Sequence, residues 1–353
     1  RGKRAHSAAR GKCNRGGAVG GRSLGAAAMA STHIRVLATG GTIAGSGAGG
    51  TGRAYTPGRI GIAEMAAEVR ALGIPALLDA VEIAAIGSQD IGWAEWQALH
   101  QQITAANSDA AVDGVIVTHG TDTAEETALL LDLTLPAGKP VVLVGAMRPA
   151  DAVGSDGMRN FANAVRVASD PGSAGRGVLV VMGDQVFAAS DVRKASTSSI
   201  DAFRGFPRGP LGNVTPSSLD WFGPPDRLGE GPRFSWPAEL PQVEIVAAHA
   251  GMSACAVEAL AGCGARGLVL AGMGQGNAPG PVLAALAQTG LPVVRASRVD
   301  QGYVDRNLEV DDDAHGFVAA RSYNPAKARI LLQLLIASGI TDPAAMQAHF
   351  DRR

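Results

Sequence analysis

The segment "GVIVTHGTDTAEETALLLDL", residues 114–133, is the most informative part of this 353-residue chain. Val115, Ile116 and Val117 predict a buried strand, and residues 124–133 predict a helix. Polar side chains crowd the junction between the two: Thr118, His119, Thr121, Asp122, Thr123, Glu125 and Glu126. In open α/β sheets, ligands bind beyond the carboxyl ends of the strands. The segment therefore predicts a ligand site at the end of this strand.

Helix capping is a simpler explanation for some of these side chains. Asp122 with Glu125, or Thr123 with Glu126, has the spacing of a capping box. Acids in the first turn also suit the helix dipole. Capping does not explain residues 119–121, which precede the cap. We therefore expect a capped helix start that also presents side chains to a ligand.

Composition limits the class of protein. Apolar residues make up 46% of the chain and charged residues 18%, with a formal net charge of −1. These values are typical of a globular protein, and the balanced charge gives no reason to expect nucleic acid or a membrane surface as a partner. No apolar run approaches the roughly 18 residues that a membrane span needs.

Strand and helix signals alternate along the chain. Short β-branched runs lie at 34–40, 81–87, 114–120, 140–146 and 177–183, and helix-like segments lie at 62–72, 93–105, 124–133 and 157–168. This alternation predicts an α/β fold with a mostly parallel, doubly wound sheet covered by helices on both faces.

The alternation stops in residues 221–242, which are rich in proline and glycine and predict a linker. It resumes with apolar runs at 243–251, 267–274 and 292–298 and a helix at 326–339. We therefore expect a larger N-terminal domain at 32–220 and a smaller C-terminal α/β domain at 243–353.

Residues 1–31 stand apart because they carry basic side chains and no acid. A transit-like peptide, a nucleic-acid tail and an unstructured extension are all open. Since Met29 begins the first segment with a fold signal, we favour a disordered extension and exclude it from the fold.

Three cysteines bear on the compartment. Cys13 lies in the basic extension, and Cys255 and Cys263 bracket the apolar segment "AVEALAG". On one helix these two would lie about two turns apart, too far for a disulfide. We expect buried thiols in a reducing compartment, hence a cytoplasmic protein, with the periplasm as the alternative. The cysteine and histidine spacings predict no metal site.

Glycines cluster after the first strand, in "GSGAGG" at 45–50. The pattern fits a dinucleotide fingerprint only weakly, because that fingerprint must open a helix and Pro57 follows here instead. We expect a mobile loop that carries Thr42 and Tyr55 over a ligand, and no cofactor.

Several motifs together resemble the bacterial-type L-asparaginase family: "ATGGTIAG" (38–45), "IGSQD" (86–90), "VTHGTDTAEETA" (117–128), "VGAMRP" (144–149), "SRV" (297–299) and "NPAKARILLQL" (324–334). The resemblance runs in order from about 34 to 350. It implies a two-domain α/β fold and a homotetramer built as a pair of dimers. It also implies hydrolysis of a side-chain amide to a carboxylate and ammonia through an acyl-threonine, without a cofactor or metal.

The resemblance also implies roles for residues. Thr42 matches the family's nucleophile, and Tyr55 matches a tyrosine that contacts it. Thr121, Asp122 and Lys194 match a second catalytic cluster that polarises the site and relays a proton. Thr121 and Asp122 are also expected to bind the substrate.

Further matches concern substrate binding. Ser88 and Gln89 match contacts to the substrate's carboxylate and amine, and Asn277 and Glu309 match residues that reach the active site of a neighbouring subunit. Arg193 departs from the family pattern, which has an uncharged residue there, so the environment of Lys194 stays open. We expect His119 to be structural rather than a base.

Three functions remain open. An amidohydrolase acting on L-asparagine comes first, and a dual glutaminase-asparaginase is the alternative, because one methylene changes binding by only about 1 to 3 kcal/mol. A non-catalytic, amino-acid-binding regulatory protein is more remote, because a binder does not need the hydroxyls of Thr42 and Thr121.

Overall fold

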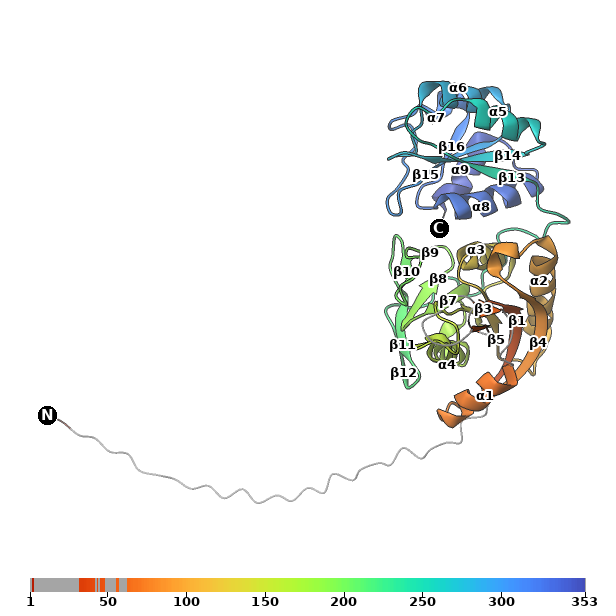
Figure 1. The fold of residues 1–353 in the computed structure, drawn as a ribbon, viewed down its shortest axis with the longest axis vertical. Helices are drawn as coiled ribbons and strands as arrows, with labels where there is room; N and C mark the ends of the chain where they lie inside the picture. The colour runs from red at the N-terminus through yellow and green to blue at the C-terminus, as the bar shows by residue number, and fades with distance from the viewer. Residues whose placement is uncertain are drawn as a thin grey trace, which may run out of the picture. The chain divides into compact units, whose positions relative to one another are not determined.

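A computed structural model of the chain describes residues 2, 32–41, 43, 45–47, 55, 56 and 62–352. An eight-stranded sheet dominates the N-terminal part, in the order β12-β11-β8-β7-β6-β5-β1-β4 (Figure 1). Its parallel strands are β1 (Thr32–Gly40), β4 (Ala76–Ile86), β5 (Gly114–Thr118), β6 (Val141–Val144) and β7 (Val178–Met182). β8 (Gln185–Ala188), β11 (Gly212–Thr215) and β12 (Ser218–Trp221) complete it with antiparallel pairings.

Helices cover both faces of this sheet. The core on one face joins the sheet to α1 (Ile62–Ala71) and α4 (Gly157–Ala168), and the core on the other joins it to α2 (Trp93–Ser108) and α3 (Ala124–Thr134). β5 shows why its sequence is continuously apolar. Ile116 faces the α1/α4 side while Val115 and Val117 face the α2/α3 side, because successive strand residues point to opposite faces. The predicted α/β class, with a mostly parallel sheet, is confirmed.

A second, four-stranded parallel sheet forms the C-terminal part, in the order β13-β14-β15-β16. Its strands are β13 (Val243–Ala247), β14 (Gly267–Gly272), β15 (Val293–Ser297) and β16 (Phe317–Ala319). The helices are α5 (Cys255–Gly262), α6 (Gly280–Gln288), α7 (Asp312–His315), α8 (Pro325–Ala337) and α9 (Pro343–Asp351). α8 contacts both this sheet and α3, so one continuous core joins the two parts.

Short elements complete the fold. β2 (Ser46–Gly47) pairs with β3 (Tyr55–Thr56), and β9 (Val192–Lys194) pairs with β10 (Phe203–Gly205), both antiparallel. Single turns of 3-10 helix, η2 (Ser88–Asp90) and η3 (Pro171–Ser173), follow β4 and α4.

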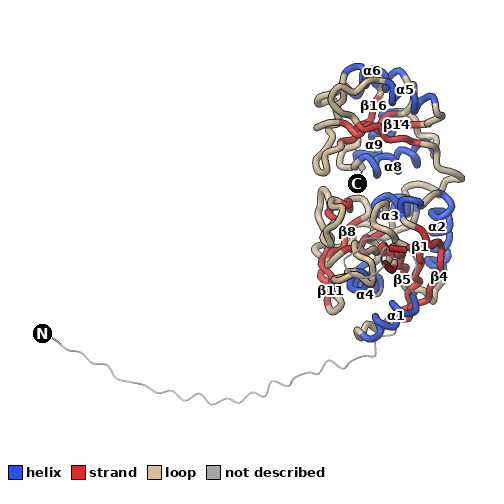
Figure 2. Tube along the Cα trace, viewed as in Figure 1, coloured by secondary structure: helices blue, strands red, loops and turns tan. Residues whose placement is uncertain are grey.

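The proline-rich segment after β12 has no helix or strand before β13 (Figure 2). Most of the segment is exposed, but a few of its side chains are held in place. Trp236 stacks on Trp93 at 5.0 Å and on His100 at 4.0 Å between ring centroids, and Arg227 pairs with Asp132 at 2.6 Å. The segment is therefore anchored to the N-terminal part at these points.

The cysteine expectation needs a correction. Cys255 begins α5 and Cys263 follows its end, as the helix assignment requires, and both thiols are free. Both are exposed, however, and not buried. α5 buries Val257 toward the core, and its ends face outward. Cys13 lies outside the described residues.

No helix among residues 32–352, as far as they are described, is both long and apolar enough to cross a membrane. The basic extension predicted at 1–31 lies outside the described residues except for Gly2.

Candidate active site

The carboxyl ends of β1 and β5 meet closely. Gly40 and Gly41 end β1 with φ angles of +97° and +78°, a region that favours glycine. A Cβ atom on Gly41 would lie 2.6 Å from the backbone nitrogen of Gly120. The two strand ends can approach this closely because Gly41 carries no side chain.

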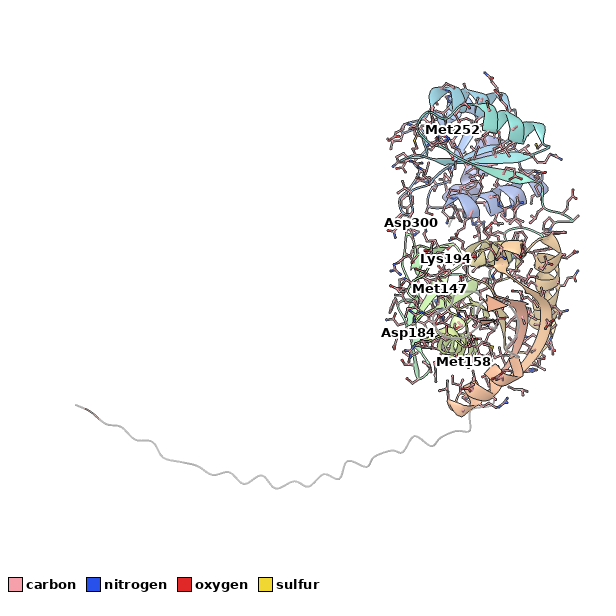
Figure 3. The ribbon with its side chains drawn as sticks, viewed as in Figure 1. Met147, Met158, Asp184, Lys194, Met252 and Asp300 are labelled. Carbon is pink, nitrogen blue, oxygen red and sulfur yellow. The ribbon has the colours of Figure 1, made fainter. Side chains whose placement is uncertain are left out.

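Lys194, labelled in Figure 3, lies at the end of β9. It joins the polar cluster that follows β5. Its Nζ donates to Thr121 Oγ1 at 2.8 Å and to Asp122 Oδ1 at 2.6 Å. Thr121 is buried, the Lys194 side chain is 17% exposed and that of Asp122 is 61% exposed. The cluster is therefore anchored in the protein at one end and open to solvent at the other.

A cavity of about 300 Å³ opens at this cluster, lined by Asp122, Lys194, Ala195, Ser196 and Thr197. A carboxylate, an ammonium and two hydroxyls can together bind a small ligand that carries both charges. Ser196 and Thr197 had not been singled out from the sequence. Their position directly after Lys194 is the signal that could have identified them.

Ser88 ties a third strand end to the site. It follows β4 in η2 and is buried. Its Oγ accepts from the backbone nitrogen of Asp122 at 3.2 Å, and its carbonyl accepts from Thr123 Oγ1 at 2.8 Å. Its neighbour Gln89 is exposed, and Gln89 Nε2 donates to Asp90 Oδ2 at 3.0 Å.

The predicted capping box at the start of α3 does not form. Thr123 is the N-cap residue, but its side chain makes no capping hydrogen bond because it is engaged with Ser88. Glu125 Oε2 instead accepts from Asn324 Nδ2 at 3.0 Å, and Glu126 Oε2 accepts from Arg329 Nη2 at 2.8 Å. The two acids therefore hold α8 of the C-terminal part.

His119 is buried and held on both sides of its ring. Its Nδ1 lies 2.7 Å from the carbonyl oxygen of Gly120, and its Nε2 lies 2.9 Å from Thr127 Oγ1. Burial lowers the pKa of His119 to about 4, against a weaker opposite effect of the Gly120 carbonyl. The ring is therefore neutral near pH 7 and fixes the backbone just before Thr121.

The loop after β6 supports Thr121 from another side. A Cβ atom on Gly145 would lie 2.7 Å from the His119 carbonyl oxygen. Asn160 Nδ2 donates to the Gly145 carbonyl at 2.9 Å, and Asp156 accepts from the backbone nitrogen of Met147 at 3.0 Å. Asp156 and Asn160 position the "VGAMRP" loop, a role that sequence reasoning missed because α4 supplies these residues from outside the motif.

Arg193 turns away from Lys194. The guanidinium of Arg193 donates to the carbonyl oxygens of Asp300 and Ser322 and lies over the Phe206 ring at 5.0 Å. Adjacent strand residues point to opposite sides, so the arginine binds the C-terminal part while the lysine enters the site. This answers the question that the sequence left open about the surroundings of Lys194.

Asn277 and Glu309 lie together in the C-terminal part. Asn277 Nδ2 donates to Glu309 Oε2 at 3.2 Å, and Glu309 is exposed. Among the described residues, no hydrogen bond or ion pair joins either side chain to Thr121, Asp122 or Lys194. The fold therefore places these two groups in a separate pair.

Both halves of the chain match models of known protein families. Residues 33–227 match the N-terminal asparaginase domain, and residues 242–350 match the glutaminase/asparaginase C-terminal domain. The chain is 43% identical to L-asparaginase 2 of Escherichia coli over 333 residues, which cover 92% of this chain and 94% of that protein.

The chain belongs to the asparaginase family.

Two further relatives differ in name. The chain is 42% identical, over 90% of its length and 92% of the relative's, to a protein of Haemophilus influenzae named probable L-asparaginase periplasmic. It is 37% identical, over 86% of each chain, to a glutaminase-asparaginase of Pseudomonas fluorescens.

Two residues that match the family's motifs lie outside this geometry. Thr42 is not among the described residues, although its neighbours Gly41 and Ile43 are described and buried. Tyr55 is described only as part of β3, and its side chain lies outside the description. The described residues contain no group of three or more His, Cys, Asp or Glu side chains that could hold a metal ion.

Proposed function

We propose that this asparaginase-family chain hydrolyses L-asparagine to L-aspartate and ammonia through an acyl-threonine intermediate. One observation carries the proposal: Lys194 Nζ bridges Thr121 Oγ1 and Asp122 Oδ1 beside a cavity of about 300 Å³. Amide hydrolysis needs an activated hydroxyl and groups that bind the substrate's own charges, and this arrangement offers both. The names of the E. coli and H. influenzae relatives agree with it.

Thr42 is the proposed nucleophile. Its Oγ would attack the side-chain amide carbon, and the amide nitrogen would take up a proton and leave as ammonia. Water would then cleave the threonine ester, which gives the aspartate carboxylate and restores the hydroxyl. Gly41, the residue before Thr42, packs closely on Gly120, and Tyr55 is proposed to contact Thr42.

Thr121, Asp122 and Lys194 are proposed to polarise the site and relay the proton. Because Lys194 donates to Thr121 Oγ1, the threonine's own O–H is directed to another acceptor. The exposed carboxylate of Asp122 suits the substrate ammonium. Ser88 and Gln89, at the end of β4, are proposed to bind the substrate's carboxylate and amine.

The direct test is ammonia release. Thr42→Ala should reduce kcat by about 10⁴-fold or more, since it removes a covalent nucleophile, and should still bind L-aspartate. A variant that keeps a tenth of wild-type turnover would transfer the role to Thr121. Ammonia release from asparagine and glutamine at matched concentrations separates an asparaginase from a dual glutaminase-asparaginase, which the name of the P. fluorescens relative keeps as the second candidate.

We further propose a homotetramer in which Asn277 and Glu309 serve the site of a neighbouring subunit. The separation of their pair from the Lys194 cluster supports this arrangement. Mixing Thr42→Ala chains with Glu309→Ala chains should restore activity, because some sites then hold both residues intact. Confirmed mixed oligomers without activity would refute the sharing of sites.

A cytoplasmic location is also a proposal, with the periplasm as its alternative. Two free, exposed thiols at Cys255 and Cys263 are typical of a reducing compartment. The H. influenzae relative is named periplasmic. Fractionation of the native cells, with markers for both compartments, decides between the two.

A further inference from the structure

A second cavity, of about 120 Å³, lies among charged side chains. The end of α3, residues 188–190, the segment after β12, Tyr323 and Arg352 all contribute to its wall. None of its lining residues lines the cavity at Lys194. Its volume equals the share of about four water molecules in the liquid, at about 30 Å³ each. The cavity is therefore a separate space, large enough for a small polyatomic ion.

Positive charge predominates in the wall. Five arginines line the cavity, against three carboxylates: Arg176, Arg208, Arg227, Arg233 and Arg352, with Asp132, Asp226 and Glu230. This leaves an excess of two positive charges. Two acids outside the lining reduce this excess: Asp191 pairs with Arg208 at 2.6 Å, and Asp170 interacts electrostatically with Arg176.

The three wall carboxylates are already engaged with arginines. Asp132 Oδ1 accepts from Arg227 Nη1 at 2.6 Å, and Glu230 lies 3.3 Å from Arg227 Nε. Asp226 Oδ2 accepts from Arg208 Nη1 at 2.9 Å. These acids therefore neutralise some arginines and leave the others without an acidic partner.

Several guanidinium donors remain unused. Arg227 Nη2 and Arg233 Nε are buried and have no hydrogen-bond partner. Arg352 makes no side-chain hydrogen bond or ion pair within the described part of the chain, whereas Arg176 donates to three carbonyl oxygens. A buried donor without a partner is destabilising, and the arginines that line the cavity offer further donors to a ligand with several acceptor oxygens.

We propose that this cavity binds a small dianionic oxyanion. Guanidinium groups match the oxygen geometry of phosphate and carboxylate with paired, charge-assisted hydrogen bonds. The ligand would contact Arg227 and Arg233 of the segment after β12 together with Arg352 at the end of the chain. It would thereby add to the hydrogen bond that Arg233 Nη2 already donates to the His349 carbonyl oxygen at 2.9 Å.

Calorimetric titration of the full chain tests the site. Inorganic phosphate and malonate are titrated in separate arms at constant ionic strength, with chloride as the reference anion. At least one of the two dianions should bind saturably with one site per chain. Arg233→Gln and Arg352→Gln should each weaken that binding by about tenfold or more, since each removes a charged donor.

Arg159→Gln is the matched control. Arg159 is an exposed arginine that pairs with Asp184 and does not line the cavity, so this variant should bind like the wild type. Arg352 is exposed, so its variant tests the site without disturbing the core. If phosphate binds more tightly, the ligand is a phosphate; if malonate binds more tightly, the ligand is a dicarboxylate. Absence of saturable binding in both arms, or equal binding by wild type and both cavity variants, would overturn the proposal.

Discussion

Lys194 and Lys327 each lie near an acid at the start of α3, Asp122 just before the helix and Glu125 in its first turn, yet in opposite surroundings. Lys194 reaches Asp122 at the mouth of a cavity, with 17% of its side chain exposed. Lys327 is fully buried, donates to the Ser190 carbonyl at 2.9 Å and lies near Glu125. One short segment thus serves two purposes, a solvent-accessible charged cluster and a buried contact to α8.

The difference has a physical consequence. Burial lowers the pKa of Lys327 to about 8, and the opposing effect of Glu125 is smaller. Burial likewise raises the pKa of Glu125. An accessible pair can exchange protons and partners with a ligand, whereas a buried pair is stable only while each charge keeps its partner. We therefore expect changes at Lys194 to affect catalysis and changes at Lys327 to affect stability.

Of the two lysine variants, Lys194→Met should have the larger effect on kcat. Loss of the bridge to Thr121 and Asp122 should lower kcat about 10³-fold, within the range of acid–base contributions. The free energy of unfolding should change by about 1 kcal/mol or less, because one partner is exposed. Ammonia release and urea denaturation measure the two quantities. Lys139→Met, which removes a lysine bonded only to backbone carbonyls, is the control. Near wild-type kcat would remove Lys194 from the reaction.

Lys327→Met should reverse this pattern. Leaving Glu125 buried without its cation should reduce the free energy of unfolding by about 3 kcal/mol. The folded variant should keep kcat within about twofold, since Lys327 does not line the cavity at Lys194. Denaturation at several urea concentrations gives the first value, with Lys139→Met again as control. A stable variant that has lost kcat would contradict the division between the two lysines.

His119 is a third buried titratable group near the start of α3, and it should make the stability of the chain depend on pH. Its folded pKa of about 4 lies below the ordinary 6.5, so the unfolded chain binds more protons between these values. Stability from this group is complete above pH 6.5 and is lost as pH falls toward 4, by up to about 3 kcal/mol. Glu125 acts in the opposite direction, because burial raises its pKa.

The measurement for His119 is therefore a difference between chains. Urea denaturation of wild type and His119→Asn is compared from pH 4 to 7, and the variant should show the smaller loss on acidification. His249→Asn is the matched control, because His249 also contacts the carbonyl of the next residue but is exposed. Parallel curves for wild type and His119→Asn would show that this histidine is not buried in the neutral form.

Thr123→Val should produce the smallest effect. It removes one hydrogen bond to the Ser88 carbonyl with little change of shape, so unfolding should become easier by about 1 kcal/mol. Thr104→Val, at an exposed position of α2, is the control. If the Thr123 hydrogen bond stabilised the fold without positioning Ser88 for a ligand, substrate affinity would not change. We expect a few-fold rise in KM, because Ser88 lies at the site.

Helices and strands that are buried on most sides could be predicted directly from the local sequence. The apolar run of β5 and the bounds of α4 at 157–168 agree with the prediction. β8 to β12 were not predicted, because each has at most four residues and several are half-exposed. Their pairing depends on neighbouring strands rather than on their own pattern. The contacts of Arg227 and Trp236 after β12 could not be predicted either, since proline and glycine indicate only the absence of helix and strand.

The sequence by itself determined the α/β class, the strand-to-helix junctions and the family to which the chain belongs. These depend on residue spacing and on short motifs, which are local properties. Only the tertiary structure decided the direction of each polar side chain. Glu125 and Glu126 have the spacing of caps but reach α8, and Arg193 and Lys194 are adjacent yet point apart. The reason is that a polar group pairs with whichever partner the packing brings within about 3 Å, and those partners lie far away in the sequence.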